Sequence, residues 1–347
     1  MTMIYYPEDG NLDALGEAPV GLIGYGSGAR AIAMNMRDHG VNLLVSSDDA
    51  AEQRRAQADG FTIGMIGNVV RQCAVIVLAL TDEVMTTAYM QSVSPNLTKG
   101  DTLIFISAYN VTFGFIEPPP FVDVGLVAPR SIGELLRHAV TTGDAVPSFV
   151  AVWQDASRQA WQRVLAVALA MGAVEGGAVE VNIEQEAELS LFVQQAIIPA
   201  FHHIIVTAAD LLMKQGYPPE AVLMDLYLTG KFAQYIEEAG RSGILQALRH
   251  TSTTGQYSTY SRMARFSELK LERLMEVTLD EIRSGDFSRE WSQEQADGQP
   301  RLRKLLKQYE ARDLWDLEQQ TLDLIGEDPE DWSDEGDNDV SDDGEFL

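Results

Sequence analysis

A glycine-containing turn near the start of the chain has the residue types that can hold a dinucleotide phosphate. The pattern Gly24-x-Gly26-x-x-Ala29 follows the apolar segment 20–23 and leads into a stretch with apolar residues at helical spacing. The first glycine permits a tight turn, the second lets the backbone approach a pyrophosphate, and a small third residue lets helix and strand pack closely. The N-terminus of such a helix faces the phosphates with unpaired N–H groups. We expect these cofactor contacts at Gly24, Tyr25, Gly26, Ser27, Gly28 and Ala29.

The segments around this turn indicate an α/β domain followed by helices. Continuous apolar runs of strand length, typical of parallel strands buried on both faces, occur at 41–46, 74–80, 102–106, 122–127, 149–152 and 173–174. Beyond residue 182 helical patterns replace them, at 184–216, 218–239, 257–284 and 299–325. The sequence therefore predicts a Rossmann-type, doubly wound parallel sheet over residues 1–182 and an all-α domain over 183–326.

The charge of the chain argues against two classes of partner. The 347 residues carry a formal net charge of -27, whereas nucleic acids and anionic membranes attract basic surfaces. The segment 327–347 holds eleven acidic residues and no Lys or Arg, and we predict an acidic disordered tail there. The chain starts without a basic or apolar leader, and no apolar run approaches the ~18 residues of a membrane span. We expect a cytoplasmic protein with no nucleic-acid or membrane partner.

Ordered motifs between residues 4 and 305 share the pattern of one enzyme family. They include Ile4-Tyr5-Tyr6-x-Glu8-Asp9, Asp82-Glu83-Val84, Pro95-Asn96-Leu97, Val127-Ala-Pro129 and Ser284-Gly285-x-Phe287. Taken in order, they resemble the short class of ketol-acid reductoisomerases, or acetohydroxy acid isomeroreductases. The resemblance implies a knotted helical second domain that forms a homodimer with a shared active site. It also implies hydride transfer from a nicotinamide cofactor, preceded in the family by a magnesium-dependent alkyl shift.

The positions that hold magnesium in this family carry other side chains here. The family's Glu-Thr-Asp-Leu-Phe-x-Glu helix corresponds to Glu188-Leu-Ser190-Leu-Phe-Val-Gln194, and two glutamates of a second helix correspond to Met224 and Leu228. Because Mg²⁺ requires oxygen ligands, chiefly carboxylates, we predict no metal site. In the alternative, a slipped register, the ligands are Glu186, Glu188 or Asp225, which we expect to lie ~100–200° around the helix from the required face.

The catalytic histidine of the family is also missing, and this shapes the predicted reaction. Its position corresponds to Ser107, which precedes Tyr109 and Asn110. A site without metal suits an iminium carbon, which is already cationic and needs no Lewis acid. We therefore predict a metal-independent NAD(P)H-dependent reductase of an imine or iminium in a small or cyclic substrate, rather than a functional ketol-acid reductoisomerase. The alternatives are a carbonyl reductase and a non-catalytic NAD(P)-binding pseudoenzyme.

The remaining site residues are assigned partly from the residues and partly from the resemblance. In NADP-preferring members an Arg at the end of the second strand and serines in the next loop bind the 2′-phosphate; the matching positions here are Ser47, Ala50 and Glu52, with Asp48 and Asp49 between them. Because acidic side chains repel a phosphate, we expect NAD(H) to be favoured over NADP(H), although Arg54 and Arg55 follow closely. Thr81 and Ser107 complete the predicted cofactor contacts. The candidate catalytic residues are Tyr257, Tyr227 and Arg130, with Tyr109 as a further candidate acid. The predicted substrate pocket contains Asn110, Ser190, Gln194, Met224, Leu228, His250 and Ser252.

Overall fold

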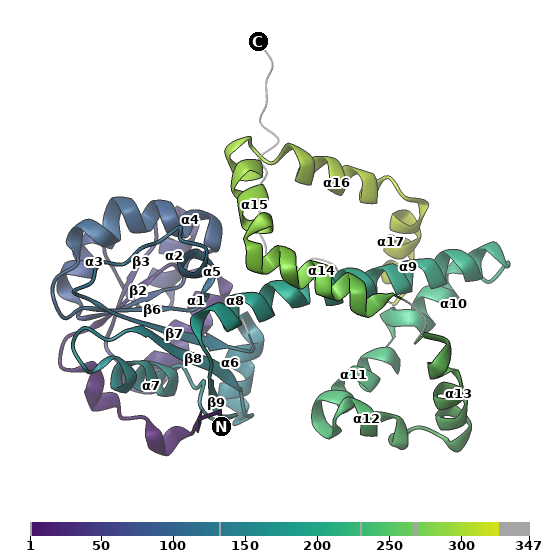
Figure 1. Ribbon diagram of the computed structural model, residues 1–347, viewed down its shortest axis with the longest axis horizontal. Coiled ribbons are helices and arrows are strands. Elements are labelled where there is room, and N and C mark those ends of the chain that lie inside the picture. The colour runs from purple at the N-terminus through teal and green to yellow at the C-terminus, as the bar shows by residue number, and fades with distance from the viewer. Residues whose placement is uncertain (1, 132, 230, 267–269, 326–347) are drawn as a thin grey trace, which may run out of the picture. The chain divides into compact units, whose positions relative to one another are not determined.

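The computed structural model describes residues 2–131, 133–229, 231–266 and 270–325 (Figure 1). The chain divides into two compact units, Met1–Ser190 and the part from Leu191 onward. The predicted tail, residues 327–347, lies outside the described residues, and the predicted boundary between residues 182 and 183 stays a prediction.

The first unit is built on one nine-stranded sheet with the strand order β1-β9-β8-β7-β6-β5-β2-β3-β4. The strands are β1 (Ile4–Tyr5), β2 (Val20–Ile23), β3 (Leu43–Ser46), β4 (Thr62–Ile63), β5 (Val75–Leu78), β6 (Thr102–Phe105), β7 (Asp123–Pro129), β8 (Ser148–Gln154) and β9 (Ala178–Glu180). The strands from β4 to β7 in this order are parallel, which places their carboxyl ends along one edge.

Two layers of helices bury the two faces of this sheet, as the continuous apolar runs predict. Val75 and Val77 of β5 pack into one core cluster, whereas Ile76 and Leu78 pack into the other. The first cluster includes residues of α1 (Ser27–Asp38), α2 (Ala50–Ala58), α6 (Gly133–Thr142) and α7 (Ala160–Ala170). The second includes residues of α3 (Ile66–Gln72), α4 (Asp82–Ala88), α5 (Tyr109–Thr112) and α8 (Ile183–Phe192). Figure 1 shows α3 and α4 on one side of the sheet and α7 on the other.

The second unit is helical throughout its described residues. Its helices are α9 (Ile198–Lys214), α10 (Pro219–Leu223), α11 (Lys231–Ser242), α12 (Ile244–Ala247), α13 (Thr253–Met263), α14 (Leu271–Ser284), α15 (Asp286–Ala296), α16 (Pro300–Glu310) and α17 (Asp313–Ile325). A small core forms where Val222 and Leu223 of α10 meet Ala209 of α9, with Leu314 and Leu317 of α17 packed against it. Short π-helical turns at Val193–Ile197 and Met224–Leu228 interrupt two of the predicted long helices.

The predicted fold class is confirmed, but three details of the sheet are wrong. The sheet is mixed rather than all parallel, because β8 runs antiparallel to β7 and β1 runs antiparallel to β9. The strand predicted at 173–174 is instead β9, four residues later, because Gly177 (φ +86°) turns the chain just before it. The strands β1 and β4 were not predicted, since two-residue strands leave no periodic pattern.

The continuous helix Ile183–Lys214 is long and apolar enough, by length and composition, to cross a membrane. The expectation from the sequence did not include this helix as a possible membrane span. It rested on an uninterrupted apolar run, and polar residues such as Glu and Gln interrupt the run here. A single helix of this kind is weak evidence for a membrane span. Only 11% of its most apolar window is buried inside the chain, so most of that window is exposed or half-buried.

Candidate functional site

The turn between β2 and α1 has the geometry that a dinucleotide site requires. Gly24 has φ +102°, and a Cβ at this position would lie 2.5 Å from the carbonyl oxygen of Ala79, so only glycine fits. Gly26 is the N-cap of α1 and offers no side chain to the first-turn N–H groups. Ala29 is buried against the sheet. The first N–H groups of α1 are thus left to bind an anion.

A carboxylate that is not among the predicted cofactor contacts lies beside this turn. Glu52 accepts a hydrogen bond from the backbone N–H of Tyr25 (2.8 Å) and another from Ser47 Oγ (2.5 Å). Asp49 caps α2 by accepting from the N–H of Glu52 (2.7 Å), which fixes the start of that helix. Asp48, the predicted cofactor contact, is exposed next to them. The sequence placed Glu52 among the residues that disfavour a 2′-phosphate, but it did not show the hydrogen bond to the turn, which joins residues 27 positions apart.

Three further polar residues meet at the carboxyl edge of β5 and β6, next to the turn strand β2. Asp82 begins α4, directly after β5, and Ser107 follows β6. Ser107 Oγ lies 3.2 Å from Asp82 Oδ1, and the buried Asn110 donates to the same oxygen at 3.2 Å and to the Asp82 carbonyl at 3.1 Å. Thr86 Oγ1 donates to Asn110 Oδ1 (3.0 Å) and fixes the amide orientation. The predicted Thr81 is exposed immediately before Asp82.

The surroundings of Asp82 favour its protonated form. The pKa of this carboxyl is raised from 3.8 to about 6, mainly by burial; the hydrogen bond from Ser107 opposes the shift, and the nearby charges of Glu83 and Glu186 contribute to it. A carboxyl with such a pKa can give and take a proton near neutral pH. A raised carboxyl pKa next to a cofactor turn is a marker of functional sites.

An ion pair between a buried carboxylate and a partly exposed guanidinium lies near this cluster. Glu186 of α8 is only 2% exposed; it accepts from the Ala108 N–H (3.0 Å), from Ser190 Oγ (2.8 Å) and from Arg130 Nη2 (3.0 Å). Arg130 also stacks over the Phe149 ring, 4.6 Å from its centroid. The expectation that Glu186 faces away from Ser190 is wrong, because residues four apart lie on one face of a helix. The predicted Arg130, Ser107, Asn110 and Ser190 therefore belong to one region of the first unit.

The predicted residues of the second unit have local structural partners or lie exposed. Ser252 caps α13 by accepting from the Gly255 N–H (3.1 Å). His250 Nε2 lies 3.3 Å from Glu238 Oε1, and the Tyr257 side chain is 74% exposed. The hydroxyl of Tyr227 donates to Glu318, and burial together with that carboxylate raises the pKa of the tyrosine. Met224 and Gln194 are exposed, and Leu228 packs beside the small core of the unit.

The side chains of this chain do not fit the two magnesium ions that the family resemblance implies. Ser190 donates to Glu186 instead of offering a carboxylate, and a thioether and an isobutyl group at Met224 and Leu228 are not ligands of a hard cation. Glu186 is already satisfied by Arg130 and two N–H or O–H donors. Among the described residues, no group of three or more His, Cys, Asp or Glu side chains is placed to hold a metal ion.

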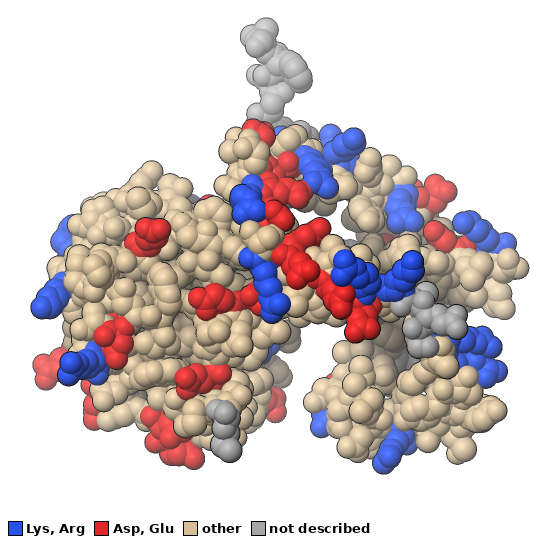
Figure 2. Space-filling view, in the orientation of Figure 1, with Lys and Arg blue, Asp and Glu red and all other residues tan. Residues whose placement is uncertain are grey.

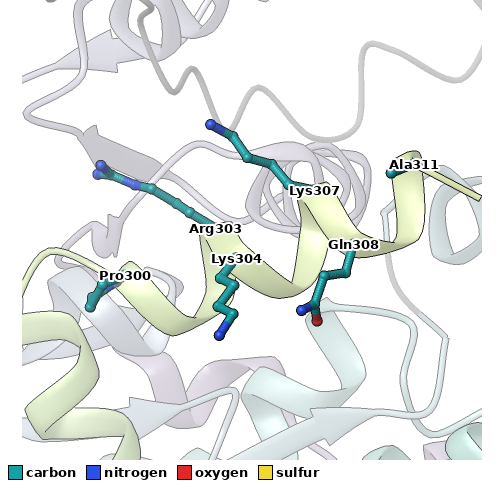
Figure 3. A pocket seen from close by; sticks show the side chains of 6 residues that line it. All are labelled: Pro300, Arg303, Lys304, Lys307, Gln308 and Ala311. Atoms are coloured by element: carbon teal, nitrogen blue, oxygen red, sulfur yellow. The ribbon is translucent and has the colours of Figure 1, made fainter.

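A separate pocket of about 450 Å³ lies on α16 and contains none of the predicted site residues. It is lined by Pro300, Arg303, Lys304, Lys307, Gln308 and Ala311. Figure 3 shows the long side chains of Arg303 and Lys307 on one side of the helix and those of Lys304 and Gln308 on the other. Figure 2 shows basic side chains gathered along this helix in an otherwise acidic protein. This open, basic surface differs from the polar cluster of the first unit and lacks its acid–base groups.

Comparison with known proteins matches both halves of the chain to one family. Residues 14–177 match the acetohydroxy acid isomeroreductase NADPH-binding domain, and residues 183–326 match the ketol-acid reductoisomerase C-terminal domain. The NADP(+) ketol-acid reductoisomerase of Methanopyrus kandleri is 33% identical over 329 residues, which cover 94% of this chain and 99% of that protein.

Solved structures agree with this assignment. The NADH-preferring ketol-acid reductoisomerase of an uncultured archaeon is similar with a TM-score of 0.87 and 26% identity, over 94% of this chain and 100% of that one. A semialdehyde dehydrogenase NAD-binding protein from Cupriavidus necator, solved with calcium and NAD, is similar with a TM-score of 0.58 and 17% identity, over 77% of this chain and 99% of that one. The second likeness shows the fold alone.

These matches overturn two expectations. The prediction of a metal-independent imine reductase that is not a ketol-acid reductoisomerase is wrong, because both family regions and a nearly full-length relative match ketol-acid reductoisomerases. The prediction of NAD(H) over NADP(H) with no metal is also contradicted, since the matched domain is NADPH-binding, the relative uses NADP(+), and the family reaction requires magnesium. The unsuitable donor set described above is therefore a difference between this chain and its family.

Proposed function

The chain belongs to the ketol-acid reductoisomerase family, and on that premise we propose that it reduces a small ketol acid, or the 3-hydroxy-2-keto acid derived from it, with NAD(P)H. It is an oxidoreductase that uses a nicotinamide cofactor. The observation that carries the proposal is the match of both domains over nearly the whole chain. The structure supports the proposal as well, because the glycine turn and the acid–base cluster follow neighbouring strands of the sheet.

The first unit contains the groups that would hold the cofactor. Gly24 and Gly26 let the backbone approach the pyrophosphate, the free N–H groups of α1 face its charge, and Ser47 lies at the end of β3. The bound nicotinamide supplies a hydride to the carbonyl carbon. Asp82 and Ser107 follow the carboxyl ends of β5, which pairs with the turn strand β2, and of β6, which pairs with β5. The reacting end of a ligand lies at such an edge in doubly wound sheets.

Arg130 is the group that we assign to the substrate carboxylate. Its Nε is held by the Ala128 carbonyl at 3.2 Å and its Nη2 by Glu186, whereas Nη1 has only a long contact of 3.4 Å to Ser190. The side chain is 30% exposed. A guanidinium held in this way presents a fixed positive charge, and its Nη1 can donate a charge-assisted hydrogen bond to a carboxylate.

The experiment separates reduction from isomerisation. The full-length chain is mixed with NADPH or NADH and with either acetolactate or its isomerised 3-hydroxy-2-keto acid, each with and without added Mg²⁺, and cofactor absorbance is followed. Reduction of the isomerised keto acid, which needs no alkyl shift, is the expected result. If neither compound is reduced although fluorescence shows that the cofactor binds, the proposal is overturned.

We also propose a homodimer, which the family resemblance implies. The helix Ile183–Lys214 leaves apolar side chains exposed, and they extend over several turns at Val193, Ile197, Phe201, Ile204 and Leu211. An exposed apolar row of this length is typical of a surface that binds another protein. Sedimentation of the full-length chain should give twice the 38.2 kDa mass of one chain, and a concentration-independent monomer would contradict the proposal.

A further inference from the structure

The pair Asp82 and Ser107 has the geometry of a proton relay that ends at the cofactor side of the sheet. Ser107 Oγ is 3.2 Å from Asp82 Oδ1 and 3.5 Å from Oδ2. Within the described residues its other hydrogen bond is a long one from the Tyr109 N–H at 3.4 Å. When Asp82 carries the proton and donates to Ser107 Oγ, the serine hydrogen is left free to point toward a ligand.

The remaining contacts of Asp82 hold its carboxyl in one place. Asn110 donates to Oδ1 and to the Asp82 main-chain carbonyl, and Asn110 is itself 2% exposed and held by Thr86. These bonds fix the carboxyl on the Ser107 side of α4. No basic side chain forms an ion pair with Asp82 among the described residues, so its proton is not displaced by a salt bridge.

The charged groups that face Asp82 come from two helices. Glu83 is the exposed residue that follows it on α4, and Glu186 lies on α8 with its charge paired by Arg130. Both carboxylates disfavour a second negative charge at Asp82, and burial acts in the same direction. The site therefore retains a proton at a pH where an exposed aspartate has lost it.

Other candidate acids of the first unit are less suitable. The Tyr109 hydroxyl is buried without a hydrogen-bond partner among the described residues, and burial with the charges of Asp82 and Glu83 raises its pKa to about 12. Such a phenol holds its proton too tightly for efficient transfer near neutral pH. Arg130 donates to Glu186, and a guanidinium in a protein keeps its protons.

We propose that Asp82 supplies, through Ser107 Oγ, the proton that the substrate oxygen takes up as its carbonyl carbon is reduced. This inference rests on the proposed reductase function. The carbonyl carbon gains a C–H bond from the cofactor hydride, and the carbonyl π electrons become an oxygen lone pair. That oxygen takes the Ser107 proton, and Ser107 is reprotonated by Asp82, which becomes a carboxylate and regains a proton from solvent. Ser107 is thus the catalytic residue, and Asp82 is a positioning residue that acts through it.

The first test follows the proton itself and needs neither cofactor nor turnover. The full-length chain is labelled with ¹³C at aspartate carboxyls, and the Asp82 signal is assigned by its absence in Asp82→Asn. We expect it to titrate near pH 6, to move to higher pH in Ser107→Ala, which removes a hydrogen bond to the carboxylate, and to move to lower pH in Glu83→Gln. An Asp82 signal that titrates at the ordinary aspartate value, or that ignores both variants, overturns the proposal.

The second test uses the pH profile of keto-acid reduction, which a purely structural role of Asp82 does not shift. Wild-type kcat/KM should fall as pH rises above about 6, and Asp82→Asn should lower kcat by about 100-fold and remove this dependence. Asp82→Glu should restore part of both, and the cofactor Kd should stay within about two-fold. An Asp82→Asn enzyme with wild-type kcat and pH profile overturns the relay and leaves the reductase function intact. A wild-type chain that reduces no keto acid overturns the function, whatever the titration shows.

Discussion

The two units of this chain differ in how their predicted functional residues are used. At the carboxyl edge of the sheet in the first unit, the glycine turn, Ser107, Asn110 and Arg130 are joined by hydrogen bonds into polar clusters that include Asp82, Glu52 and Glu186. In the helical unit, Tyr227 binds Glu318, Ser252 caps a helix and His250 lies beside Glu238. Acid–base chemistry is therefore concentrated in the sheet unit, and the following predictions test that contrast.

The largest effect is expected at the glycine turn. Gly24→Ala would place a Cβ 2.5 Å from the Ala79 carbonyl oxygen at a left-handed φ, so the turn must shift. We expect NAD(P)H affinity to fall by about 100-fold or more, because a displacement of ~1 Å is enough to lose the contacts. Isothermal titration calorimetry measures it.

The matched control is Gly240→Ala in α11, where a Cβ has no heavy atom within 4 Å. It makes the same chemical change in the helical unit and should leave cofactor affinity unchanged. Equal losses of affinity in both variants would show that the contrast between the two units is false.

The second effect concerns stability and its dependence on pH. Because the folded pKa of Asp82 is raised from 3.8 to about 6, the folded state binds a proton that the unfolded state has lost in this interval, so stability falls as pH rises through it. The full shift corresponds to a cost of about 3 kcal/mol above pH 6. Asp82→Asn should therefore stabilise the chain by up to this amount at about pH 8 and change little at about pH 3.5.

Urea unfolding at the two pH values checks this prediction. If Asp82→Asn is equally or less stable than wild type at the higher pH, the claim that ionised Asp82 destabilises the fold is wrong. The view that the sheet unit gives up stability for function would then be wrong as well.

A smaller effect is expected in the helical unit. Tyr227→Phe removes the donor to Glu318 and should lower the free energy of unfolding by about 1 kcal/mol. Tyr257→Phe, at an exposed position, should leave stability unchanged. Neither change should alter cofactor affinity. If Tyr227→Phe abolished keto-acid reduction in a stable protein, its predicted catalytic role would be right and the contrast between the units wrong.

The smallest effect is electrostatic. Glu52→Gln keeps an acceptor for the Tyr25 N–H and Ser47 but removes a negative charge beside the phosphate turn. The repulsion between the Glu52 carboxylate and the cofactor phosphates should amount to less than about 1 kcal/mol. Its removal should lower the Kd for NADPH about three-fold at low salt, and this gain in affinity should shrink as salt is added. A weaker affinity in the variant would show that the carboxylate assists binding.

The sequence predicted those parts of the fold and the site that depend on local patterns. The turn from Gly24 to Ala29 and the strands buried on both faces follow from residue spacing over a few positions. Asp82 and Glu186 acquire their roles from neighbours far away in the chain, and only the packed structure shows these contacts. The contact between Glu186 and Ser190 could have been predicted from the sequence, because a spacing of four residues places both on one helix face. The predicted function was wrong because it gave more weight to the missing metal ligands than to a family match over nearly the whole chain.

Transfer of hydrogen from the cofactor to a keto acid is the measurement that tests the central claim most directly. NADPH deuterated at the transferred position of the nicotinamide is mixed with the full-length chain and the 3-hydroxy-2-keto acid, and the product is examined by NMR. We predict deuterium on the former carbonyl carbon, in an amount that falls with rising pH in wild type and not in Asp82→Asn. Cofactor that binds, as shown by calorimetry, but delivers no deuterium to any keto or ketol acid would contradict the assignment of this chain as a reductase.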